Sequence, residues 1–151
     1  MRRGRSVGSV GRMMRLSSPD HAEMFALARR LERTDAAHAR DDRRALLLFW
    51  FGTGAARLHA EEDALLTAWE RHGGRDHPLN AAIRAERDRL SCAVAEVAVE
   101  PRPSATAIRR VGAALTTLLR VQDRELAAVV ERVLPGSELA GVDQALRRAH
   151  G

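Results

Sequence analysis

The chain has 151 residues and a single cysteine, so it suits one domain and cannot form an intramolecular disulfide or a cysteine-based zinc site. All 25 basic residues are arginine, and five of them precede the first acid, Asp20. The other 20 arginines balance the 20 acidic residues, so the formal net charge of +5 belongs to the N-terminal segment. This distribution argues against a uniformly basic nucleic-acid-binding domain.

Residues 1–18 are interpreted as a disordered, arginine-rich tail, followed by one domain over residues 19–151. The charge of the tail is its only means of binding nucleic acid or acidic lipid, and a leader without a binding role is the preferred interpretation. The longest apolar run, residues 45–51, is too short to cross a membrane, and no apolar run follows Arg2-Arg3 as an export signal would require. We therefore expect a soluble protein in a reducing cytoplasm.

The first two helices are predicted from start signals and apolar spacing. One begins near residues 17–20 and ends near residues 36–38. The next runs from Asp41 or Asp42 to Arg71 without interruption and ends at Gly73-Gly74. Its predicted inward stripe consists of Leu47, Trp50 or Phe51, Gly54, Leu58, Glu61, Leu65 and Trp69.

The third helix is predicted to open at His77-Pro78, because proline is tolerated in the first turn. Its apolar face carries Leu79, Ile83, Arg87, Leu90, Val94 and Val97. The fourth is capped by Ser104 and stops at Pro135. Its inward positions are Ile108, Val111, Leu115, Leu118, Gln122, Leu126, Val129 and Val133.

A short helix over residues 137–149 completes the chain and is expected to pack across one end of the fold. Four amphipathic helices joined by short connections bury their apolar faces most simply as neighbours running up and down. The predicted fold is therefore an all-α, up-down four-helix bundle with a short C-terminal helix.

Polar side chains interrupt these stripes at positions that an antiparallel bundle would bring into one layer. On the second helix, Arg57 and Glu61 are four residues apart and share a face. Comparable positions on the other helices are His21, Arg87, Leu118 and Gln122. Burying charge is costly unless it is paired, so this layer is the candidate site.

The segments around these positions resemble hemerythrin-like (HHE cation-binding) domains over nearly the whole chain after the tail. The resemblance rests on Asp20-His21 with residues 28–31, on residues 57–69 with the acidic run 61–63, on residues 77–87, and on residues 124–135. In that family a histidine on the first helix, a His-x-x-x-Glu pair on the second, a histidine on the third and a second His-x-x-x-Glu pair on the fourth hold two irons in a four-helix bundle.

When the metal-ligand positions of the family are transferred to this sequence, the resemblance implies that most of the ligands are missing. His21 matches the first histidine and Glu61 the first bridging carboxylate, whereas Gln122 replaces the second glutamate. The three other histidines are replaced by Arg57, Arg87 and Leu118. Leucine cannot coordinate a metal, and guanidinium stays protonated. We therefore expect a degenerate di-iron site without a cofactor, in a non-enzymatic binding or structural module. The alternative is an iron protein with an altered ligand set, in oxygen or redox sensing.

Several hypotheses follow for these residues. Arg57 or Arg87 would supply the positive charge that Glu61 lost with the metal, forming a polar network with Gln122. A shifted metal site at His59, Glu62 and Asp63 is the rival. It is disfavoured because residue 59 lies about 200° around the helix from residue 57, and because an acidic run is more often a solvated face.

Two further interpretations stay open. Arg57 and Arg87, with His21 nearby, would form a pocket for a small carboxylate or phosphate if they faced one another. The bundle would otherwise be a docking module that uses its arginine tail. Cys92 lies in a helical pattern and is expected in the core rather than as a nucleophile. The sequence identifies no particular partner and no oligomeric state.

Overall fold

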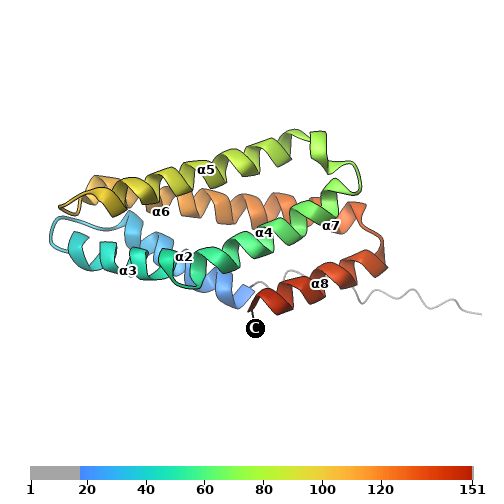
Figure 1. The fold of residues 1–151 in the computed structure, drawn as a ribbon, viewed down its shortest axis with the longest axis horizontal. Coiled ribbons are helices and arrows are strands. Elements are labelled where there is room, and N and C mark those ends of the chain that lie inside the picture. The colour runs from blue at the N-terminus through green and yellow to red at the C-terminus, as the bar shows by residue number, and fades with distance from the viewer. Residues whose placement is uncertain (1–17, 151) are drawn as a thin grey trace, which may run out of the picture.

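The computed structural model describes the backbone of residues 18–150 and the side chains of residues 21–148. Every element in this range is helical and no strand occurs in it, which confirms the all-α prediction. The predicted tail lies outside the described residues, except that Ser18 begins the first helix, α2. Figure 1 shows the helices arranged as long rods lying side by side.

The helix α2 (Ser18–Glu32) ends earlier than predicted. The chain turns after it, where the Asp35 side chain accepts the backbone N–H of His38 at 2.9 Å. His38 directly precedes the next helix, α3 (Ala39–Phe51). The local hydrogen bond thus holds the connection in a turn instead of a further helical turn.

The prediction of one uninterrupted second helix was wrong. The chain forms α3 and then α4 (Gly54–Glu70), with a break at Gly52-Thr53. At the break Gly54 packs against Phe49 so closely that an added Cβ would lie 2.1 Å from Cε2 of the ring. The glycine permits this contact, and the contact sets the direction in which α4 leaves the break.

The start of the third helix is confirmed. After η1 (Gly74–Asp76), the helix α5 (Pro78–Val99) begins with proline at its first position. The Nδ1 atom of His77 accepts the N–H of Leu79 at 3.1 Å and so caps the helix. Before this, the chain leaves α4 through Gly73, whose φ of 89° is a conformation that favours glycine.

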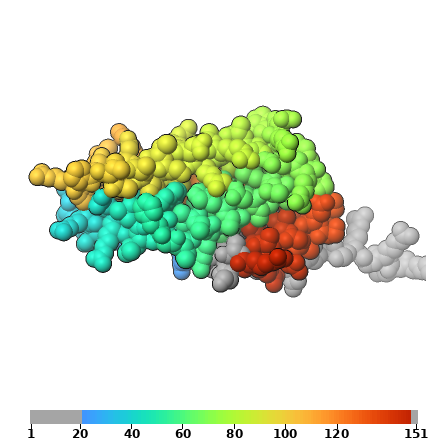
Figure 2. Space-filling view, in the orientation of Figure 1, coloured from blue at the N-terminus to red at the C-terminus, as the bar shows by residue number. Residues whose placement is uncertain are grey.

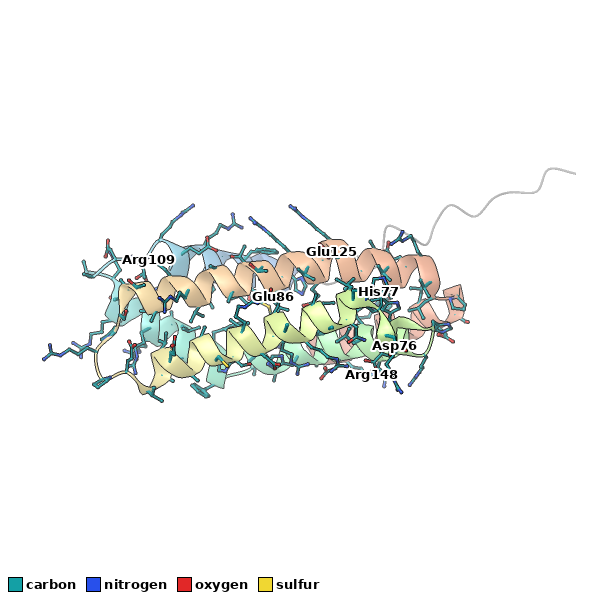
Figure 3. All side chains as sticks on the ribbon, turned by 90° about the horizontal axis from the view of Figure 1, so that it is seen from above. Asp76, His77, Glu86, Arg109, Glu125 and Arg148 are labelled. Carbon is teal, nitrogen blue, oxygen red and sulfur yellow. The ribbon has the colours of Figure 1, made fainter. Side chains whose placement is uncertain are left out.

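The fourth predicted helix is continuous but contains a wider turn. Ser104 caps α6 (Ala105–Arg120), which passes through the π-helical segment η2 (Val121–Leu126) into α7 (Ala127–Val133). Figure 3 shows this as one rod that carries Arg109 and Glu125. The π turn shifts the inward stripe by one residue, because each π turn takes up more residues than an α turn. Beyond it the buried residues are Val130 and Leu134, in place of the predicted Val129 and Val133.

The core lies between these rods. The helix α6 packs against both α2 and α5, and α4 packs against α3, α7 and α8 (Gly136–His150). The last helix lies along α4 rather than across one end as expected (Figures 1 and 2). It buries Val142 and Leu146 there, and both belong to the same apolar cluster as the rest of the core.

Burial on α3 and α4 agrees with the predicted stripe only in part. Leu58, Leu65 and Trp69 are buried, whereas Phe51, beside the break, is 71% exposed. On α3 Leu46 is the buried leucine, one residue before the predicted Leu47. No helix within the described residues combines the length and apolar character needed to cross a membrane.

Candidate functional site

A buried histidine joins three helical segments at the predicted layer. The Nε2 atom of His21, on α2, lies 2.6 Å from Oε2 of Glu61 on α4. Its Nδ1 atom lies 2.5 Å from Oδ1 of Asp123 in η2. His21 is 3% exposed and Glu61 is fully buried, while Asp123 is partly exposed. The imidazole therefore bridges two carboxylates that come from different helices.

Asp123 was missed by the sequence interpretation, which placed Gln122 in this layer. Gln122 is indeed buried, at 2% exposure. The π-helical segment winds more widely than an α-helix, and its Asp123 side chain also reaches the interior and contacts His21. The hint in the sequence was the run of four polar residues from Gln122 to Glu125 on an otherwise amphipathic helix.

The electrostatics favour a protonated His21. Burial of the ring favours its neutral form, but the hydrogen bonds to Asp123 and Glu61 outweigh this and raise the pKa to about 9. At neutral pH both ring nitrogens then carry a proton, and each donates it to a carboxylate. A histidinium in the core thus lies beside Glu61.

Arg87, on α5, makes its ion pairs with the two residues that follow Glu61 on α4. Its Nη1 atom lies 2.7 Å from Oδ1 of Asp63 and 3.5 Å from Oε1 of Glu62. The observed ion pairs of Arg87 are thus with the two residues after Glu61, Glu62 and Asp63. The arginine instead ties α5 to the acidic run that follows Glu61 on α4.

The acidic run is not the solvated face that was expected. Glu62 is fully buried, and only Asp63 is exposed. Burial raises the pKa of the Glu62 carboxyl to about 7, although the Arg87 charge acts in the opposite direction. The Oε2 atom of Glu62 is buried and finds no hydrogen-bond donor among the described residues.

The side chain of His59 is partly buried, although it was expected to face solvent. Its ring packs edge-on against Trp50, with ring centroids 5.7 Å apart, and burial lowers its pKa. The two carboxylates of the rival metal set, Glu62 and Asp63, contact Arg87, whose charge opposes a cation there. Within the described residues no group of three or more His, Cys, Asp or Glu side chains is arranged to hold a metal ion.

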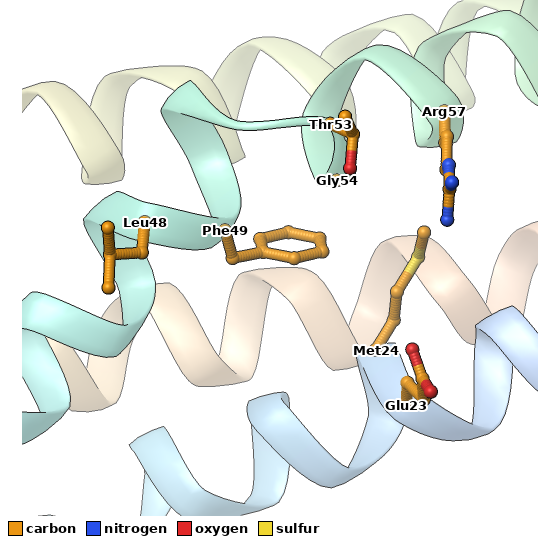
Figure 4. A pocket seen from close by; sticks show the side chains of 7 residues that line it. All are labelled: Glu23, Met24, Leu48, Phe49, Thr53, Gly54 and Arg57. Carbon is orange, nitrogen blue, oxygen red and sulfur yellow. The ribbon is translucent and has the colours of Figure 1, made fainter.

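Arg57 lies apart from Arg87. It is half-buried and lines a pocket with Glu23 and Met24 beside the α3–α4 break (Figure 4). Arg87 does not line this pocket and pairs with Asp63 instead. Cys92 is exposed on α5, so the expectation that it belongs to the core was wrong.

The donor set does not fit a di-iron centre of the implied kind. Leu118 is fully buried in its predicted place and has no atom that can bind a metal. Both nitrogens of His21 lie at hydrogen-bonding distance from carboxylates. Gln122 Oε1 is buried, with no donor among the described residues.

Comparison with known proteins adds no relative. No family model matches the chain, and no curated protein and no solved structure is significantly similar to it.

Proposed function

We propose that this protein is a divergent hemerythrin-like, up-down four-helix bundle whose di-iron site has been replaced by a histidinium–carboxylate layer. In this proposal it is a non-catalytic binding or structural module. The observation that carries the proposal is His21 between Glu61 and Asp123, at 2.6 and 2.5 Å.

Support for the bundle comes from how the rods pack. The predicted four helices correspond to α2, to α3 with α4, to α5, and to α6 with α7, and α6 packs against both α2 and α5. The layer that resembles the metal site of the family lies at the contact of α2, α4 and η2. Inward-facing polar residues from several helices are the usual way in which a bundle builds a site in its core.

Support for the loss of iron comes from charge and donor chemistry. A carboxylate buried as completely as that of Glu61 needs a neighbouring cation. A histidinium meets that need and uses both ring nitrogens as donors, so the ring has no lone pair left for a metal. The same proton that stabilises Glu61 thus disfavours coordination at His21.

Support for a non-catalytic role comes from access. His21 and Glu61 are at most 3% exposed, so a substrate cannot reach these groups without opening the core. A general acid or base must come within hydrogen-bonding reach of the group it protonates or deprotonates. The layer is therefore better suited to hold helices together than to turn over a substrate.

The test is metal analysis of protein purified without a histidine tag and then reconstituted with ferrous iron under anaerobic conditions. We expect well under one iron per chain and an unfolding temperature that a chelator does not change. A content of roughly two irons per chain, with the absorption of an oxo-bridged pair, would overturn the proposal. Iron that binds to the unmodified chain but not to His21→Asn would instead support the alternative of an altered ligand set.

A further inference from the structure

The outer face of α3 exposes large apolar side chains. Of the four large hydrophobic residues that are exposed within the described part of the chain, Val99 and Val133 lie singly on α5 and α7. The other two, Leu48 and Phe51, lie three residues apart on α3 and are 67% and 71% exposed. Residues at this spacing share one face of a helix, and Figure 2 shows α3 in teal on the surface of the molecule.

This face is apolar along the C-terminal half of α3. Residues 45–51 are all apolar, so the helix has one apolar face towards the core, with Leu46 buried there, and a second towards solvent. Leu47 is partly buried and joins Leu48 and Phe51 on the solvent side. A helix that is apolar all round is normally covered all round. An exposed apolar face of this kind marks an interface with another molecule.

The face has an unpaired charge at each end, and the two charges are opposite. Arg44 is exposed one turn before Leu48, on the same side of α3. Glu23, on α2, is also exposed, and it lines the pocket at the α3–α4 break with Leu48 and Thr53 (Figure 4). It therefore lies beside the C-terminal end of α3. Neither Arg44 nor Glu23 forms an ion pair or a side-chain hydrogen bond with another described residue.

We propose that this face binds a second copy of the chain, with the two α3 helices antiparallel about a two-fold axis at Leu47 and Leu48. In a two-fold dimer the same face meets itself, so it must carry the complement of each of its own groups. Arg44 lies three residues before Leu47, and Phe51 lies three residues after Leu48. The axis therefore brings Arg44 of one copy to the Phe51 ring of the other, where a guanidinium and an aromatic ring attract each other.

The antiparallel arrangement also pairs the free charges. It lays the N-terminal half of α3, with Arg44, over the C-terminal half of the second α3, beside which Glu23 lies. These ion pairs favour a second copy over an anionic lipid surface or a nucleic acid, because both of those partners require an excess of cations. The inference goes beyond the proposed function and does not depend on the loss of iron, since His21 and Glu61 are buried in the core.

The experiment is sedimentation velocity of the full-length protein over a range of about 5 μM to 1 mM. The face of one helix is small for a stable dimer, so we expect a reversible monomer–dimer equilibrium with a Kd on the order of 10 to 100 μM. Phe51→Ser and Leu48→Ser should each weaken dimerisation about tenfold or more, because they remove the apolar centre of the interface. Val99→Ser, at an exposed apolar residue of α5, is the matched control and should leave the equilibrium unchanged.

An exchange of charges tests the antiparallel geometry. Arg44→Glu and Glu23→Arg should each weaken dimerisation, because each sets like charges of the two copies against one another. The double variant restores opposite charges, so it should dimerise more tightly than either single variant. All the substituted positions are exposed. Circular dichroism and unfolding temperatures like those of the unmodified chain will show that any change comes from the interface and not from the fold.

Three results would overturn the proposal. They are a monomer at every concentration, a dimer that Phe51→Ser and Leu48→Ser leave unchanged, and a double charge variant that dimerises no more tightly than the single variants. A monomer that sediments with phosphatidylglycerol vesicles would also overturn it and would assign the face to an anionic lipid surface. Metal content plays no part in these readouts, so their outcome is separate from that of the proposed loss of iron.

Discussion

The Nε2 atom of His21 lies 2.6 Å from Oε2 of Glu61, although the two residues are 40 positions apart in the sequence. The contact joins the start of α2 to the middle of α4 inside the core. With Asp123 at the other ring nitrogen, it places one cation between two carboxylates.

Removing the buried carboxylate should weaken the fold. Glu61→Ala leaves the His21 charge buried without one of its two partners, and we expect a loss of about 3 kcal/mol in the free energy of unfolding. Urea denaturation at pH 7 measures it. Glu125→Ala, at an exposed position on η2, is the matched control and should change stability by less than about 0.5 kcal/mol. A loss of that small size for Glu61→Ala would mean that the pair contributes little.

Stability should fall in alkaline solution because of His21. Its folded pKa of about 9 is above the ordinary value of 6.5, so its contribution is fully present below pH 6.5 and is lost as the pH rises towards 9. We expect a loss on the order of 3 kcal/mol between these pH values. Urea denaturation at pH 6.5 and pH 9 measures it, and His21→Asn should remove most of the difference. An imidazole NMR titration of His21 with a midpoint near 6.5 would contradict the prediction.

Glu62 should give a second pH dependence in a different range. Its folded pKa of about 7 is above the ordinary 4.5, so the stability that it contributes is present below pH 4.5 and is lost as the pH rises through 7. Glu62→Gln should therefore be more stable than the unmodified chain at pH 8, by about 3 kcal/mol, and similar to it at pH 4.5. Chemical denaturation at the two pH values provides the check. Asp63→Asn, at the exposed neighbour, should show no such gain, and a destabilised Glu62→Gln at pH 8 would show that its pairing with Arg87 outweighs burial.

Substituting a glycine on α6 should destabilise the fold, whereas substituting a glycine on α8 should not. A Cβ at Gly112 would lie 2.7 Å from the backbone nitrogen of Glu32 and 2.8 Å from the carbonyl oxygen of Ala28, so Gly112→Ala must push α2 away from α6. We expect a loss of about 1 to 3 kcal/mol. At Gly141 an added Cβ meets nothing within 4 Å, so Gly141→Ala should stabilise α8 by up to about 1 kcal/mol. Thermal and urea unfolding of both variants test this contrast, and equal effects would contradict it.

Local signals in the sequence predicted the helical character of the chain and several element ends. The Pro78 start of α5 and the Ser104 cap of α6 depend on hydrogen bonds and torsion angles within a few residues, so sequence alone was enough. Apolar spacing also predicted the burial of Leu58, Glu61 and Leu65, because a helical face follows from its period.

Two of the errors arose where that period breaks. The glycines at the α3–α4 break and the π turn in η2 each change the direction or rotation of a helix, and α-helical counting carries no information about either. After the π turn Val130 is buried in place of Val129, and Asp123 reaches His21. Both changes depend on how a rod packs against its neighbours.

By itself, then, the sequence determined that polar residues would interrupt an apolar helical layer, because that pattern is local and periodic. It placed His21 and Glu61 in the layer and marked Arg57, Arg87, Leu118 and Gln122 as departures from a metal site. Only the tertiary structure decided which charges meet. Partner choice depends on the rotation and register of whole helices, and these set His21 against Glu61 and Asp123, and Arg87 against Glu62 and Asp63.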